Sequence, residues 1–354
     1  MPLKQNAMNY IGARVDSLFL TIPKIAAPFR PKRAIDADTY EQQINFYYDR
    51  GFVEAPETFF TFPETAPAHE KIHEADYGDE GGKYQVYRFA SGYMPQNPMI
   101  RDDYLGFAEN RSGYLVRWTH GDAGRKTVLC LHGYMLGEPQ QAEKMFKVDR
   151  LFQKGLDVVL FITPFHWKRA PQAKSLRGIF LQPDDVVMTC ECFGQAMYDL
   201  AATMQILGKL GAGAVGIIGA SLGGYNAALF ACLSRAPAFC AMMVPAVNFS
   251  KPFGPDTARL PFKPSPSLQA MMNQVWQLHS PLNFTPRLPL ENILIVASEG
   301  DQLCPFEHVA ALCEKWGWPR HQFMTGGHWL TARPADRGRA WYGFLADIRF
   351  IEAL

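Results

Sequence analysis

The segment GIIGASLGGYNAALF, residues 216–230, sets a serine between an apolar run and a helical pattern, which limits the folds open to the chain. Gly219, Ser221 and Gly223 form a GxSxG motif. A tight turn from a strand into a helix holds the serine in a crowded backbone conformation, where only small neighbours avoid clashes. The hydroxyl then lies at the positive end of the helix dipole. The motif predicts that Ser221 is a nucleophile at a strand-to-helix turn.

A serine is a poor nucleophile alone, so an acid and a base should follow it in the chain in that order. The segment ILIVASEGDQLCP places Asp301 just after an apolar strand-like run, with Pro305 turning the chain into the next helix. Glu299 lies two residues earlier and is the alternative acid. We expect Asp301 to orient the base, because Glu299 is nearer to the end of the strand.

The segment FMTGGHWLTARP predicts that His328 is the base, in a glycine-flanked loop between a short strand and the last helix. Two other histidines, His308 and His321, also follow Asp301. His308 falls within a helical pattern and His321 at the start of a strand, so neither fits the position of the base as well.

Acyl transfer forms an oxyanion that needs two backbone N–H donors held in place before reaction. One donor is expected to be the N–H of Leu222, directly after the nucleophile. The segment LCLHGYMLGE follows an earlier strand, and we expect the Tyr134 amide to be the second donor. His132 precedes the nucleophile, which breaks the chain order of a base, so a structural role is expected for it.

Apolar runs alternate with helical patterns from Thr127 onward, as in a parallel sheet covered by helices on both faces. The runs KYQVYRF and GYLVRWTH come before them and predict an antiparallel opening to the same sheet. The expected class is α/β, a mostly parallel, doubly wound sheet with antiparallel N-terminal strands. Helices are expected near residues 39–51, 140–153, 185–210, from 222, 306–316 and 337–351.

Three regions are expected along the chain. Residues 1–80 form a mainly helical N-terminal extension that packs on the body, and residues 81–354 form the catalytic domain. The proline-rich stretch 245–290 interrupts the alternation and predicts a small cap with one helix near residues 267–279. Its apolar side chains are expected either to line an acyl pocket or simply to pack on the body. They are Leu268, Met271, Met272, Val275, Trp276 and Leu278.

Composition favours a soluble cytoplasmic protein that does not bind nucleic acid. The 354 residues are 48% hydrophobic and 19% charged, with a formal net charge of +1. The seven scattered cysteines suit buried thiols in a reducing compartment. Cys190 and Cys192 form a CxC, but residues two apart on a helix point in different directions, so no metal site is expected.

The N-terminus has an apolar repeat at helical spacing, ended by Pro23. Its members are Met8, Ile11, Val15, Leu18 and Ile22, and the basic residues Lys24, Arg30, Lys32 and Arg33 follow. Docking of this helix on the body or on a second subunit is the favoured interpretation. Contact with a membrane surface is the alternative, because basic residues beside an apolar stripe favour anionic lipid.

Taken together, the four motifs HGYMLG, GASLGGY, SEGDQLCP and GGHW make residues 85–354 resemble the α/β-hydrolase superfamily. The doubled glycine after Ser221 is similar to the dienelactone hydrolase, polyester depolymerase and prolyl oligopeptidase-like branches. Serine rather than aspartate at this turn differs from the haloalkane dehalogenases and epoxide hydrolases. The resemblance implies hydrolysis of esters, thioesters or peptides without a cofactor, and it does not cover the first 80 residues.

The sequence therefore predicts a serine esterase with a small-molecule ester substrate and Ser221, His328 and Asp301 as its triad. A thioesterase, acyltransferase or peptidase would use the same residues. Prolyl oligopeptidase-like enzymes usually carry a propeller repeat, and no repeat is visible here. A non-catalytic binding protein on the same fold is the alternative of another class. The substrate and the oligomeric state stay open.

Overall fold

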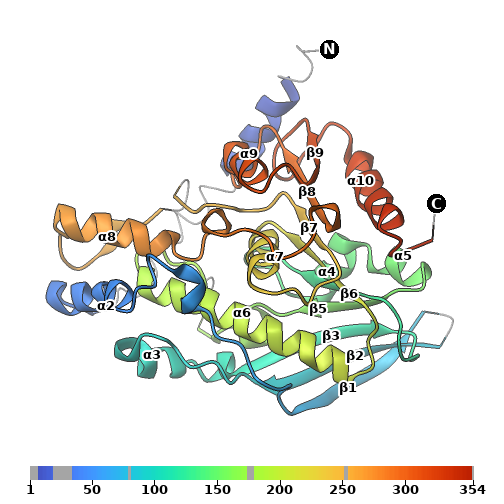
Figure 1. The fold of residues 1–354 in the computed structure, drawn as a ribbon, viewed down its shortest axis with the longest axis horizontal. Helices are drawn as coiled ribbons and strands as arrows, with labels where there is room; N and C mark the ends of the chain where they lie inside the picture. The colour runs from blue at the N-terminus through green and yellow to red at the C-terminus, as the bar shows by residue number, and fades with distance from the viewer. Residues whose placement is uncertain (1–6, 19–33, 79–80, 174–178, 251–253, 353–354) are drawn as a thin grey trace.

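The computed structural model describes residues 7–18, 34–78, 81–173, 179–250 and 254–352, and one nine-stranded sheet runs through them (Figure 1). The order of the strands in the sheet is β1-β2-β3-β5-β4-β6-β7-β8-β9. The strands are β1 His69–Tyr77, β2 Gly82–Ala90, β3 Ser112–Thr119, β4 Thr127–Leu131, β5 Asp157–Phe161, β6 Val215–Ala220, β7 Cys240–Met243, β8 Ile293–Ser298 and β9 Arg320–Met324.

The sheet changes from antiparallel to parallel at β5. The pairs β1–β2, β2–β3 and β3–β5 are antiparallel, and every later pair from β4–β5 to β8–β9 is parallel. Residues of β4, β5 and β8 are buried along their whole length, as expected of strands covered on both faces. The predicted fold class is confirmed.

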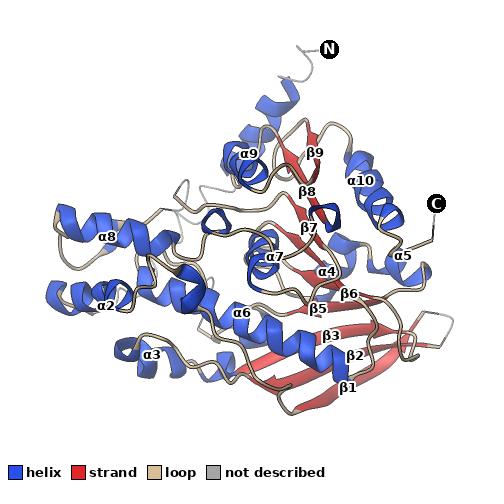
Figure 2. Ribbon diagram, in the orientation of Figure 1, coloured by secondary structure: helices blue, strands red, loops and turns tan. Residues whose placement is uncertain are grey.

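Helices cover the sheet on both sides (Figure 2). One hydrophobic core contains buried residues of α2, α6, α7, α8 and α9, and the other contains those of α4, α5 and α10. The α-helices are α2 Ala37–Asp49, α3 Arg101–Leu105, α4 Pro139–Phe146, α5 Val148–Gln153, α6 Val186–Lys209, α7 Leu222–Leu233, α8 Pro266–Gln277, α9 Phe306–Lys315 and α10 Pro334–Asp347. Among the described helices, none combines the length and apolar character needed to cross a bilayer.

Two expectations about the elements are wrong. Strand β1 lies inside the range assigned to a mainly helical extension, so the sheet begins before residue 81. This edge strand has mostly exposed, charged side chains, and for that reason it lacks the apolar alternation that reveals a strand. The helix expected over 140–153 is two helices, because Lys147 adopts a left-handed conformation with φ 53° between them.

The N-terminal helix, residues 7–18, presents a different face to the body from the one that its apolar repeat predicted. Gly12 and Asp16 are buried, whereas Ile11 and Leu18 are exposed. Gly12 has no side chain and allows close contact with the body, and the Asp16 carboxylate accepts hydrogen bonds from backbone N–H groups. The basic residues of the membrane-surface alternative, together with Ile22 and Pro23, lie outside the described residues.

The insertion between β7 and β8 carries the expected helix, α8. Its buried residues Leu268, Met272, Val275 and Trp276 belong to the same hydrophobic core as α6 and α2. Figure 1 shows α8 beside α2. The Trp276 indole donates to Phe249 O over 3.1 Å. These contacts favour packing on the body over the acyl-pocket interpretation.

Candidate active site

Ser221 occupies the turn between β6 and α7 with a backbone conformation that L-residues rarely adopt. Its φ and ψ are 55° and −115°, and its N–H donates to Met243 O over 3.0 Å. A Cβ on Gly223 would lie 1.9 Å from Leu131 O, and one on Gly219 would lie 2.0 Å from Gly223 O. Glycine is therefore required on both sides of the serine, and the strained turn directs the half-buried Ser221 hydroxyl off the sheet edge.

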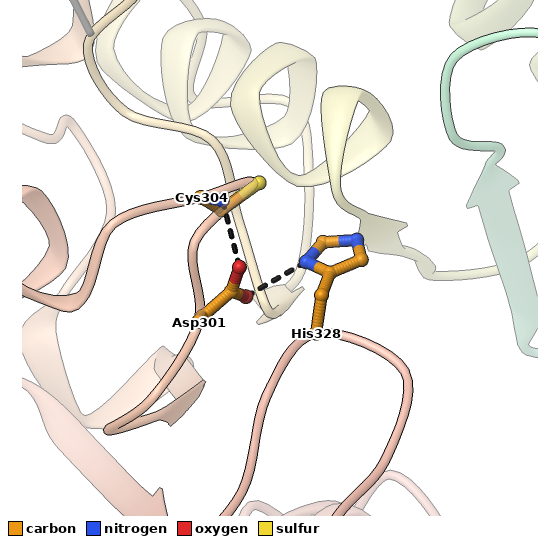
Figure 3. Close-up of side chains that lie close together, drawn as sticks. All are labelled: Asp301, Cys304 and His328. Carbon is orange, nitrogen blue, oxygen red and sulfur yellow. Dashed lines mark hydrogen bonds and ion pairs between the residues drawn. The ribbon is translucent and has the colours of Figure 1, made fainter. Parts of the chain in front are cut away.

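Asp301 and His328 form a buried pair at the carboxyl ends of β8 and β9. Asp301 Oδ2 lies 2.7 Å from His328 Nδ1, and each residue is 3% exposed. Asp301 Oδ1 accepts hydrogen bonds from Leu303 N and Cys304 N, which fix the carboxylate from its other side. Figure 3 shows the carboxylate between the imidazole and the backbone of Cys304. With Nδ1–H donated to Asp301, the Nε2 atom is the one left to act as a base.

Cys304 links this pair to the serine. Its Sγ lies 3.7 Å from Ser221 Oγ, and its backbone N–H lies 2.8 Å from Asp301 Oδ1. The structure therefore brings Ser221, Asp301 and His328 into one neighbourhood although they lie in three separate turns or loops. Among the described residues, no hydrogen bond joins Ser221 to His328. Such bonds are often long in free enzymes and tighten when substrate binds.

The charge state of His328 depends on its buried surroundings. Burial lowers the pKa of His328, but interactions with Cys304 and Asp301 outweigh this effect, so the pKa lies above its usual value. Burial raises the pKa of Cys304, so its sulfur is an uncharged thiol at neutral pH, and the charge interaction with His328, which requires a thiolate, is then absent. The Asp301 carboxylate is then the negative charge that stabilises the imidazolium.

The loop after β4 lies against the serine turn and is held by two buried histidines. A Cβ on Gly133 would lie 3.6 Å from Ser221 Cβ, which measures how closely this loop approaches the serine. His132 Nε2 accepts from Thr163 N, and His166 Nε2 accepts from Met135 N, each over 3.2 Å. Burial lowers the pKa of His132 to about 4 and that of His166 to about 3, so both are neutral acceptors.

Of the two residues expected to donate to the oxyanion, Leu222 follows the serine directly, and Tyr134 follows Gly133 in the loop that approaches the serine. Leu222 is buried at the first position of α7, where the backbone N–H groups have no partner within the helix. The half-buried Tyr134 lies between Gly133 and Met135, and its ring centroid is 6.1 Å from that of His166.

Asp301, Cys304 and His328 are also the one group of potential metal ligands in the described part of the chain. Their ligand atoms lie within 4.8 Å of one another. Both Asp301 oxygens already accept hydrogen bonds, and His328 Nδ1 uses one of them. A metal that took His328 Nδ1 and Asp301 Oδ2 as ligands would displace the bond between the carboxylate and the imidazole. Cys190 and Cys192 are separately buried in α6 and do not belong to the group.

Three neighbours of the site were not identified from the sequence: Cys304, His166 and Asp16. Cys304 comes three residues after Asp301, and its proximity follows from the turn that Asp301 stabilises. His166 follows β5, the strand next to β4, so the strand order could have indicated it once known. Asp16 precedes Gln302 by 286 residues and His328 by 312 residues in the chain, and no local pattern marks it.

Known proteins match this chain in sequence over most of its length. A family model described as alpha/beta hydrolase domain containing 18 matches residues 117–259, which include Ser221. Two uncharacterized proteins of Mycobacterium tuberculosis, Rv2627c and MT2702, are 27% identical over 360 residues. Each alignment covers 94% of this chain and 86% of the relative.

Solved structures match the fold. Acetyl xylan esterase 1 from Thermoanaerobacterium sp. JW/SL YS485 aligns with a TM-score of 0.58 at 15% identity, covering 85% of this chain and 93% of that one. Acetyl xylan esterase from Paenibacillus sp. R4 aligns with a TM-score of 0.57 at 13% identity, covering 92% and 98%. At these identities the likeness concerns the fold. The strand order, the serine turn and these matches show that the chain has the α/β-hydrolase fold.

Proposed function

We propose that this protein is a serine hydrolase that cleaves carboxylic esters, with Ser221 as nucleophile, His328 as base and Asp301 as the acid that orients the base. One relationship carries the proposal. A serine with φ 55° lies 3.7 Å from a thiol whose own backbone N–H binds the carboxylate of a buried Asp–His pair. A strained serine beside such a pair has no evident structural use, whereas acyl transfer needs both.

In the proposed reaction, His328 Nε2 takes the proton from Ser221 Oγ as the oxygen attacks the ester carbonyl. Asp301 holds the imidazole through Nδ1 and stabilises its positive charge. The oxyanion accepts hydrogen bonds from the N–H groups of Leu222 and Tyr134. His328 then protonates the leaving alcohol. In the second half of the reaction, His328 takes a proton from the water that attacks the acyl-enzyme and gives it to Ser221 Oγ as the acid product leaves.

The loop contacts support the choice of Tyr134 as a donor. The N–H of Met135 is engaged by His166, and the turn from Gly133 to Leu136 closes with a 3.2 Å hydrogen bond. Donors fixed in this way before the reaction stabilise the oxyanion without further reorganisation. We call the loop after β4, which contains Tyr134, the donor loop. The neutral His132 and His166 are thus proposed to hold the donor loop in place and not to bind the substrate.

The substrate class is tested with p-nitrophenyl esters from acetyl to octanoyl, an acyl thioester and a peptide anilide. The acetyl ester is a suitable first substrate, because two proteins with the same fold are acetyl xylan esterases. Turnover of esters by the wild type and at least a thousandfold loss in Ser221→Ala, on the order of a triad knockout, is the expected result. Preference for the thioester or the anilide would reassign the class, and no turnover of any substrate would favour a binding protein.

A further inference from the structure

The N-terminal helix, residues 7–18, touches both loops that carry the proposed acid and base. In Figure 1 this helix is the blue segment at the top of the molecule, next to the ends of β8 and β9. Its contacts come from Asn9, Gly12 and Asp16, which share one helical face because they are three and four residues apart. The resemblance to known hydrolases did not include this part of the chain, so its role has been open.

Asp16 is the centre of the contact. Its Oδ2 accepts hydrogen bonds from His328 N over 2.8 Å and from Gln302 N over 3.1 Å. These two N–H groups belong to the proposed base itself and to the residue after the proposed acid. Asp16 is 0% exposed, and within the described chain no hydrogen-bond partner reaches its Oδ1. Burying a carboxylate costs free energy, and the two backbone hydrogen bonds offset part of that cost.

Close backbone packing fixes the helix against the same loops. A Cβ on Gly12 would lie 2.1 Å from Gly327 N, and a Cβ on Gly300 would lie 2.7 Å from Asn9 O. Asn9 Oδ1 also accepts from Gly326 N over 2.6 Å. The helix therefore contacts the residues on both sides of the acid–base pair and leaves little room for either loop to shift.

We propose that Asp16 is a positioning residue that bridges the acid loop, residues 300–304, and the base loop, residues 326–328, and so holds His328 in register with Asp301. This inference rests on the proposed function of the same site. The 2.7 Å bond between Asp301 and His328 joins two loops from different strands. Gly300 N donates to Gly326 O over 2.8 Å where the loops begin, and Asp16 adds a second link farther along both loops, at Gln302 and His328. Misplacement of a catalytic group by about 1 Å can lower the rate about a hundredfold.

The test compares Asp16→Ala, Asp16→Asn and, as a matched control on the exposed face of the same helix, Ser17→Ala. Ser17 Oγ bonds only to Ala13 O within the helix, among the contacts of the described residues. Asp16→Ala should lower kcat on p-nitrophenyl acetate about 10- to 100-fold with little change in KM, because positioning and not binding is lost. Asp16→Asn keeps an oxygen that can accept both bonds and should restore kcat to within about threefold of wild type.

Hydrogen exchange measured by mass spectrometry provides a readout that does not depend on activity. Peptides that contain the amides of Gln302 and His328 should exchange faster in Asp16→Ala and at the wild-type rate in Asp16→Asn and Ser17→Ala. If Asp16→Ala does not fold, Asn9→Ala tests the same contact through Gly326, with faster exchange in the base loop as the expected result. Unchanged exchange in the folded variant, or wild-type kcat in Asp16→Ala, would overturn the inference. Activity retained by Ser221→Ala would instead overturn the proposed function and leave the exchange result intact.

Discussion

The Asp301 carboxylate lies 2.7 Å from His328 Nδ1, whereas the carboxylate of Glu299 accepts from the Asn9 side chain over 3.4 Å. The two acids that the sequence left as alternatives thus have different neighbours. We expect Asp301→Asn to lower kcat at least about a hundredfold, because an amide does not stabilise the imidazolium or fix its tautomer as a carboxylate does. Steady-state kinetics with Glu299→Gln as the matched variant provide the measurement. A larger loss in Glu299→Gln would move the acid to position 299.

Substitution of Cys304 distinguishes the proposed hydrolase site from a metal site. If its thiol only fills space beside Ser221, Cys304→Ala should keep kcat/KM within about tenfold of wild type, and a chelator should have no effect. A metal held by Asp301, Cys304 and His328 would make the thiol a ligand, so the same substitution would abolish metal binding. Activity after dialysis against 1,10-phenanthroline distinguishes the two. Loss that is restored by added Zn²⁺ would contradict the triad.

Gly223, two residues after the serine, should tolerate no side chain. In Gly223→Ala the new Cβ would lie 1.9 Å from Leu131 O, a backbone atom of the central strand β4 that cannot rotate away. We expect a loss of stability at the upper end of about 1–3 kcal/mol, measured by urea unfolding. Gly208→Ala in α6 is the control, because its Cβ would have no atom within 4 Å. That change should be neutral or stabilising by about 0.5–1 kcal/mol, since alanine favours helix. Equal effects of the two would argue against the turn geometry.

The buried histidine of the donor loop should make the fold sensitive to acid. Burial lowers the pKa of His132 to about 4, so the unfolded chain binds a proton near pH 6.5 while the folded protein does not. Its contribution to stability is complete above pH 6.5 and is lost progressively as the pH falls toward 4, by about 1.4 kcal/mol per pH unit. His132→Asn cannot titrate. Between pH 7.5 and 5.0, the free energy of unfolding of this variant should therefore fall by about 2 kcal/mol less than that of the wild type.

Urea unfolding at both pH values measures this difference. His73→Asn, a substitution of an exposed histidine in β1, is the control and should keep the wild-type pH dependence. If the His132 variant kept the wild-type dependence as well, the histidine would be protonated or solvated in the folded protein.

Local patterns predicted the parts of the site that depend on neighbouring residues. The small residues around Ser221 are a requirement of one turn, Asp301 follows the apolar strand β8, and His328 lies in a glycine-flanked loop after the short strand β9, so each could be proposed from its local sequence. Asp16 could not, because its partners are backbone N–H groups, which every residue carries. The apolar repeat that includes Ile11 and Leu18 indicated the wrong face of the N-terminal helix, since glycine and a bonded carboxylate allow closer contact than large side chains. Strand β1 was missed because an edge strand exposes its residues.

Covalent labelling tests the identity of the nucleophile most directly. The protein is treated with a fluorophosphonate, digested, and its peptides are sequenced by mass spectrometry. A phosphonyl adduct on Ser221 in the wild type, and none in Ser221→Ala at equal protein concentration, is the expected result, because only a serine activated by a base reacts readily with this probe. An adduct at another residue with ester turnover preserved in Ser221→Ala would contradict the account.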